Sequence, residues 1–108
     1  MATARCTPYA PAILSPNVQS RYLARMSILE TLLRQQTWFT DGTSKSTPSQ
    51  PITLAEGWLA RFQIDGAVHE FNCNWIAGLD DYANGRNWEM CGQKLATVLA
   101  LYFERVKP

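Results

Sequence analysis

Residues 57–76 read GWLARFQIDGAVHEFNCNWI, and this stretch decides the expected fold. Asp65 and Gly66 separate two runs in which apolar and polar residues alternate. Asp-Gly between such runs is typical of a two-residue type I′ turn, which needs positive φ at both central positions. The pattern therefore predicts an antiparallel β-hairpin in which Ile64 pairs with Ala67.

The pairing that follows from this turn gives each face of the hairpin a consistent chemistry. Trp58 and Phe62 would lie on one apolar face. Arg61 would lie opposite Glu70 on the other face, as a cross-strand ion pair. A slip of one residue would exchange the two faces, so the agreement between turn and faces favours this register.

Helices are predicted on both sides of the hairpin. Ser15 is a good N-cap and Pro16 suits the first helical position, and a helical apolar period then continues to Gln36. A last helix is expected after a cap at Asn87, with a buried stripe formed by Trp88, Cys91, Leu95, Val98, Leu99, Tyr102, Phe103 and Val106. The predicted fold class is therefore α+β, in the order α-β-β-α, with the antiparallel hairpin packed against two helices. Ile52–Ala55 is a candidate third strand.

The chain is expected to form one domain. Its 108 residues suffice for one core, and 46% apolar with 18% charged residues is ordinary for a globular protein. Residues 1–16 contain three prolines and no period, which predicts a flexible N-terminal tail and leaves 17–108 as a single α+β domain. The Ser-, Thr- and Pro-rich residues 40–57 predict a long loop.

The expected compartment is the cytoplasm. The first residues lack the apolar stretch of a signal peptide, and the longest apolar run, residues 98–103, is far too short to span a bilayer. The three cysteines show no spacing typical of a disulfide framework. We therefore expect free thiols and no association with membranes.

Residues able to carry catalysis or bind metal are few, and their spacing fits no site. His69 is the only histidine, and no closely spaced cysteine pair accompanies it. On one strand, His69 and Cys73 would lie roughly 13 Å apart, too far for a nucleophile and its base. We predict no catalytic residue, metal ligand, cofactor or small-molecule ligand. A small enzyme that uses Cys91 or His69 is the second alternative function.

A nucleic-acid-binding module is the first alternative. The order of elements is close to that of double-stranded-RNA-binding domains, and Arg21 and Arg25 lie one turn apart on the first helix, with Arg5 as a further candidate. The net charge is only +1, however, and residues 87–90 provide no basic cluster at the start of the last helix. RNA or DNA therefore ranks behind a protein as the expected partner.

Protein interaction is the function that the sequence supports best. Four tryptophans are present, and Trp, Met and Arg are common anchors of interfaces. Trp38 fits no periodicity, and four apolar residues fall on the expected outer faces of the helices: Leu101, Met90, Ile28 and Leu23. We predict a non-enzymatic interaction domain, such as an adaptor, inhibitor or assembly factor, which binds another protein or forms a homodimer through these five residues.

The three thiols are predicted to differ in reactivity. Cys6 falls in the expected tail, whereas Cys73 and Cys91 fall on expected core faces, where a thiol behaves as a small apolar group. Labelling of the native protein with a thiol reagent should modify one cysteine rapidly and the other two only after unfolding. Rapid native labelling of Cys91 would instead favour the alternative of a small enzyme that uses this thiol.

Overall fold

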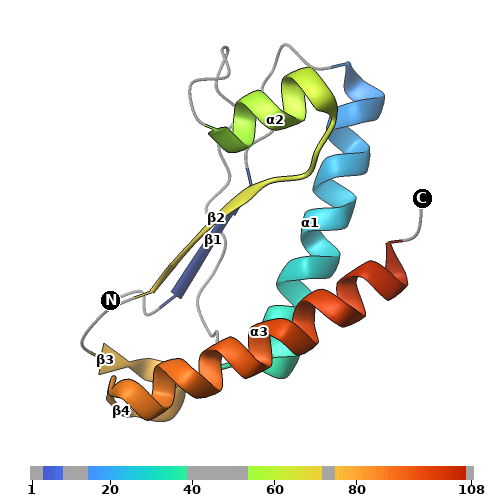
Figure 1. Ribbon diagram of the computed structural model, residues 1–108. Helices are drawn as coiled ribbons and strands as arrows, with labels where there is room; N and C mark the ends of the chain where they lie inside the picture. The colour runs from blue at the N-terminus through green and yellow to red at the C-terminus, as the bar shows by residue number, and fades with distance from the viewer. Residues whose placement is uncertain (1–3, 9–14, 39–53, 72–74, 107–108) are drawn as a thin grey trace.

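The computed structural model describes residues 4–8, 15–38, 54–71 and 75–106 (Figure 1). These residues form three α-helices and two antiparallel strand pairs, β1 with β2 and β3 with β4, which confirms the α+β class. The elements follow in the order β1 (Ala4–Pro8), α1 (Pro16–Gln36), α2 (Leu54–Phe62), β2 (Ala67–Phe71), β3 (Trp75–Ile76), the 3-10 helix η1 (Ala77–Leu79), β4 (Asp81–Tyr82) and α3 (Gly85–Arg105).

Helix α1 has the bounds that the sequence predicts. Ser15 is its N-cap and accepts a hydrogen bond from the backbone N–H of Val18, and Pro16 is the first helical residue. Glu30 and Arg34 form the expected pair one turn apart, with Arg34 Nη2 3.0 Å from Glu30 Oε1. The buried residues of α1 are Tyr22, Met26, Leu32 and Leu33, which follow the predicted apolar stripe.

Helix α3 begins earlier than predicted. Asn84, not Asn87, is the N-cap, and the two residues form a capping box. Each side chain accepts a hydrogen bond of 2.9 Å from the other residue's backbone N–H. Asn87 therefore still stabilises this end of the helix, but from the third helical position. The expected burial of Cys91 is confirmed, because only 4% of its surface is exposed.

The predicted position of the hairpin is wrong. Residues 54–62 form helix α2, and β2 pairs with β1 instead of a strand at 58–64. The pair is antiparallel and sets Ala4 opposite Phe71 and Pro8 opposite Ala67. Glu70 therefore lies opposite Arg5 in register, and not opposite Arg61.

The local reason for this error lies in residues 58–66. Trp58, Leu59 and Phe62 also fit a helical spacing, and in the structure only Leu59 is buried. No positive φ occurs at Gly66, so the type I′ turn is not formed. The left-handed residue is Gln63, with φ of 54°, directly after the end of α2. Short apolar runs are compatible with a helix or a strand, and here the helix forms.

Two further predictions, for parts of the N-terminal tail and of the long loop, are wrong. Ala4–Pro8, within the range predicted as a flexible tail, forms β1. Residues 54–57, assigned to the long loop and partly to a third strand, belong to α2. The remainder of the loop, residues 40–53, and Cys73 lie outside the described residues. The assignment of 17–108 to a single domain stays a prediction.

Buried side chains of the described residues form two core clusters. In the larger one, Tyr22, Met26, Leu32 and Leu33 of α1 meet Val98 and Tyr102 of α3, with Leu59 of α2. Figure 1 shows that α3 crosses α1 near the C-terminal end of α1, and the two helices contact each other there. The smaller cluster contains Trp38, Ile76 and Cys91 and joins the end of α1 to β3 and the first turns of α3.

Gly78 of η1 provides a test of the smaller cluster. A Cβ at this position would overlap the backbone carbonyl of Trp38 and lie 2.8 Å from the Trp38 Cβ. Backbone cannot move aside at low cost, so we expect Gly78→Ala to lower the free energy of unfolding by about 1–3 kcal/mol. Chemical denaturation measures the change.

Gly57 of α2 is the matched control, because a Cβ there meets nothing within 4 Å. Since alanine favours a helix interior over glycine, Gly57→Ala should stabilise the protein, by roughly 0.5–1 kcal/mol. Equal effects of the two substitutions would contradict the packing of η1 on Trp38.

Candidate functional site

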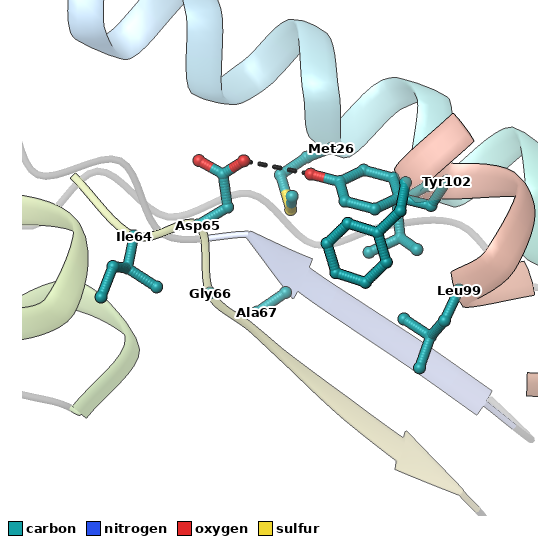
Figure 2. Close-up of a pocket in the computed structure, with 9 residues that line it drawn as sticks. Met26, Ile64, Asp65, Gly66, Ala67, Leu99 and Tyr102 are labelled. Atoms are coloured by element: carbon teal, nitrogen blue, oxygen red, sulfur yellow. Dashed lines mark hydrogen bonds between the residues drawn. The ribbon is translucent and has the colours of Figure 1, made fainter. Parts of the chain in front are cut away.

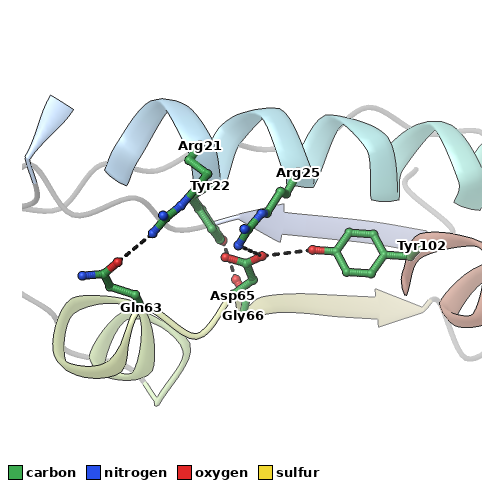
Figure 3. A network of polar contacts seen from close by, with 7 residues as sticks. All are labelled: Arg21, Tyr22, Arg25, Gln63, Asp65, Gly66 and Tyr102. Carbon is green, nitrogen blue, oxygen red and sulfur yellow. Dashed lines mark hydrogen bonds and ion pairs between the residues drawn. The ribbon is translucent and has the colours of Figure 1, made fainter. Parts of the chain in front are cut away.

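The segment between α2 and β2, residues 63–66, is tied to both long helices (Figure 3). Arg21 donates to Gln63 Oε1 at 2.7 Å, and the Tyr22 hydroxyl donates to the carbonyl oxygen of Gly66. These two contacts lie on α1, one residue apart. They hold both ends of the segment along one side of the helix.

Asp65 lies at the centre of the segment and joins α1 to α3. Its Oδ2 accepts a hydrogen bond from Arg25 Nη1 at 3.1 Å and another from the Tyr102 hydroxyl at 3.0 Å. The side chains of Arg25 and Asp65 are only 26% and 18% exposed. Hydrogen bonds to a charged acceptor in such a partly desolvated place are stronger than neutral ones on the surface.

The environment of Tyr102 disfavours its ionised form. Burial raises the pKa of the phenol, and the negative charge of Asp65 and the hydrogen bond to it raise it further. The guanidinium of Arg25 acts in the opposite direction, and the resulting pKa is about 12. Tyr102 is therefore a neutral hydrogen-bond donor at physiological pH.

An open groove of about 320 Å³ lies beside this contact (Figure 2). Three elements line it: α1, the start of β2 with its preceding residues, and α3. Met26 and Tyr102 form its buried part, at 5% and 7% exposure. The remaining lining residues are Leu29, Ile64, Asp65, Gly66, Ala67, Leu99 and Phe103.

The rim of the groove is unusually apolar. Ile64 is 53% exposed on one side, and Leu99 and Phe103 are 49% and 66% exposed on α3. The one charged lining residue, Asp65, is already paired with Arg25. The groove can therefore accept apolar side chains without leaving its own charge unpaired, and its described lining brings no nucleophile together with a base.

The structure does not bring the five predicted partner-binding residues together. Trp38 is 6% exposed and belongs to the smaller core cluster. Its indole Nε1 is buried without a hydrogen-bond partner among the described residues. Leu23, Ile28 and Leu101 pack partly buried against the larger cluster, and Met90 is 38% exposed.

The predicted division of α3 into a core face and an outer face is wrong. Leu99 and Phe103, predicted in the core stripe, line the open groove and are 49% and 66% exposed, while Leu101, predicted on the outer face, packs partly buried against the core. The signal was the width of the stripe, roughly 120–160°, which exceeds what a single neighbouring helix covers. Trp58 and Phe62, expected in the core of a hairpin, are likewise exposed on α2, at 46% and 66%.

The structure also locates the residues that were predicted for nucleic-acid binding and for catalysis. Arg21 and Arg25 direct their guanidinium groups to Gln63 and Asp65. Cys91 is a buried free thiol, and burial raises its pKa, which disfavours the reactive thiolate. Arg5 lies on β1 and His69 on β2, where Glu70 and Cys6 are their respective cross-strand partners.

The described residues contain neither a metal-binding cluster nor a helix that could cross a membrane. No group of three or more histidine, cysteine or acidic side chains is close enough to hold a metal ion in this part of the chain. Within the same residues, no helix combines the length and the apolar character that crossing a membrane requires.

No model of a known protein family matches the chain, and no curated protein or solved structure resembles it at a significant level.

The contact between Asp65 and Tyr102 predicts a specific titration. Because the folded pKa of about 12 lies above the ordinary value of 10, the folded state holds this proton more tightly than the unfolded state. Stability should therefore be unaffected below pH 10 and fall as the pH rises toward 12. The absorbance of tyrosinate, measured as the difference between the wild type and Tyr102→Phe, isolates this phenol.

Asp65→Asn should lower the pKa of Tyr102, because it removes the negative charge and weakens the hydrogen bond. The decrease should be partial, since burial is the largest cause of the shift and remains. An unchanged pKa of Tyr102 in Asp65→Asn would show that the two side chains are not in contact.

Proposed function

We propose that this chain is a non-enzymatic protein-interaction domain, and that its groove holds apolar side chains of a partner protein. The observation that carries the proposal is the exposed rim of Ile64, Leu99 and Phe103 around a preformed apolar hollow. Single exposed apolar residues are ordinary on protein surfaces. Three that converge on one groove are typical of a site that another molecule covers.

The size and shape of the groove favour a protein as its occupant. Its volume of about 320 Å³ is at the lower end of ligand pockets, which run to about 1,000 Å³. Its polar groups, Asp65 and Tyr102, already bond to each other, so few directional contacts are left for a polar small molecule. Apolar side chains that project from a partner need no such contacts.

The alternatives have less support from the described residues. A nucleic-acid interface needs cationic groups that are free to approach phosphates, and both Arg21 and Arg25 are held by internal partners. An enzyme that uses Cys91 needs a thiolate that substrate can reach, and this thiol is 4% exposed. Our proposal also places the domain in the cytoplasm, where a free thiol such as Cys91 persists.

Ile64→Asp tests the groove without altering either long helix. A charge at this position would have to be desolvated when apolar side chains fill the groove, so binding should weaken at least tenfold, or about 1.4 kcal/mol. The tagged protein is used to capture partners from a native extract, and quantitative mass spectrometry compares the wild type with the variant. One stoichiometric protein should be lost with Ile64→Asp.

Leu79→Asp is the matched control. Leu79 is also aliphatic and exposed, at 39%, but belongs to η1 and not to the groove. This variant should retain the captured protein, and thermal melts of both variants verify that they fold. Equal capture by Ile64→Asp and the wild type, or equal loss in both variants, would contradict the proposal.

A further inference from the structure

The side of α3 that does not contact α1 is exposed along the whole helix, and one edge of it borders the groove. Leu99 and Phe103 are its large apolar residues, at 49% and 66% exposure. The remaining exposed residues of this face are Arg86, Glu89, Gly92, Gln93, Ala96, Ala100 and Glu104. The face thus combines two large apolar side chains with small residues in its centre and charges near its ends.

Two charges of this face, one at each end of α3, oppose the dipole of their own helix, whereas Arg105 in the last turn suits it. Arg86 lies in the first turn, where the partial charge of the helix is positive, and Glu104 lies in the last turn, where it is negative. Each charge would be stabilised at the other end of the helix. An antiparallel neighbour of the same sequence offers that arrangement, because it sets its own C-terminal end beside Arg86.

The spacing of these charges allows both to reach one neighbour. Arg86 and Glu104 are separated by 18 residues, and at about 100° per residue this is a whole number of turns. The two side chains therefore lie on the same side of α3, roughly 27 Å apart along its axis. A second α3 running in the opposite direction would meet them with the complementary pair.

The small residues of this face form a second pattern, with nearly the same centre as the two charges. The midpoint between Arg86 and Glu104 is position 95, and Gly92 and Ala100 lie symmetrically about Ala96. A Cβ at Gly92 would meet nothing within 4 Å among the described residues, so this position leaves room for the close approach of another helix. The two centres differ by one residue, about 1.5 Å.

We propose that a second copy of this chain packs on the outer face of α3, antiparallel, with a two-fold axis near Ala96. Arg86 then lies beside the partner's Glu104, and the reverse pair forms at the other end. Leu99 and Phe103 are covered along the seam. A two-fold contact is self-complementary, as this face is in charge and in the position of its small residues.

The outer face of α3 and the groove share residues, but the charged ends of the outer face lie outside the groove. Leu99 and Phe103 contribute to both, so a second copy and a partner in the groove would compete for these two side chains, whereas Arg86 and Glu104 belong only to the outer face and Ile64 only to the groove. The dimer can therefore be tested independently of the proposed function. The full chain is used, and analytical ultracentrifugation at several concentrations gives the dissociation constant of the dimer.

Charge reversals at the two ends give opposite expectations for the dimer and the fold. Arg86→Glu and Glu104→Arg each place like charges together across the seam, so each should raise the dissociation constant at least tenfold. Both changes suit the dipole of their own helix, and Arg86→Glu also sets a second carboxylate one turn from Glu89, so we expect only a small change in the melting temperature of the monomer in either variant. The double variant Arg86→Glu/Glu104→Arg restores opposite charges and should bring the dissociation constant back to within about threefold of the wild type.

Ile64→Asp serves as the control and should leave the dissociation constant of the dimer unchanged. A wild-type protein that stays monomeric at all concentrations would overturn the proposal. So would single reversals that leave the dimer unaffected, or a double variant as weak as the single ones. The last result would show that the two charges do not face each other, even if a dimer forms elsewhere.

Discussion

The carboxylate of Asp65 is the constraint on which the rest of this structure depends. One oxygen accepts hydrogen bonds from Arg25 of α1 and from Tyr102 of α3, so a single residue fixes the path of the chain between α2 and β2. The adjacent contact of Tyr22 with the Gly66 carbonyl reinforces this path. Tyr102, held in this position, forms part of the buried surface of the groove. The fold and the candidate site thus share one polar contact.

The features that sequence predicts here are those determined by neighbours along the chain. The cap at Ser15, the proline that follows it and the apolar period of α1 are local, and the structure confirms all three. Asp65 shows the opposite case. Its turn chemistry is local, but its partners lie 40 and 37 residues away, and their hydrogen bonds prevail over the tendency of Asp-Gly to form a type I′ turn. The pairing of β1 with β2 is more distant still, and an unpatterned stretch such as 4–8 gives no sign of its partner.

The candidate site was predictable only in part, for a related reason. The sequence identified α3 as a helix with more apolar surface than one core uses, but not which part of that surface stays exposed. The answer depends on where α1 crosses α3, which leaves Leu99 and Phe103 outside and turns Leu101 inward. The prediction for Trp38 is wrong in the opposite direction, because this side chain was expected at an interface but is buried. It fits no helical period because it follows the end of α1, yet Ile76 and Cys91 bury it.

A double-mutant cycle of Asp65→Ala and Tyr102→Phe tests the central claim most directly. Free energies of unfolding for the wild type, both single variants and the double variant give the coupling energy of the two side chains. A hydrogen bond from a buried phenol to a charged, partly desolvated acceptor predicts a coupling of about 1–2 kcal/mol at neutral pH. Strictly additive effects, with no coupling beyond experimental error, would show that Asp65 does not join α1 to α3.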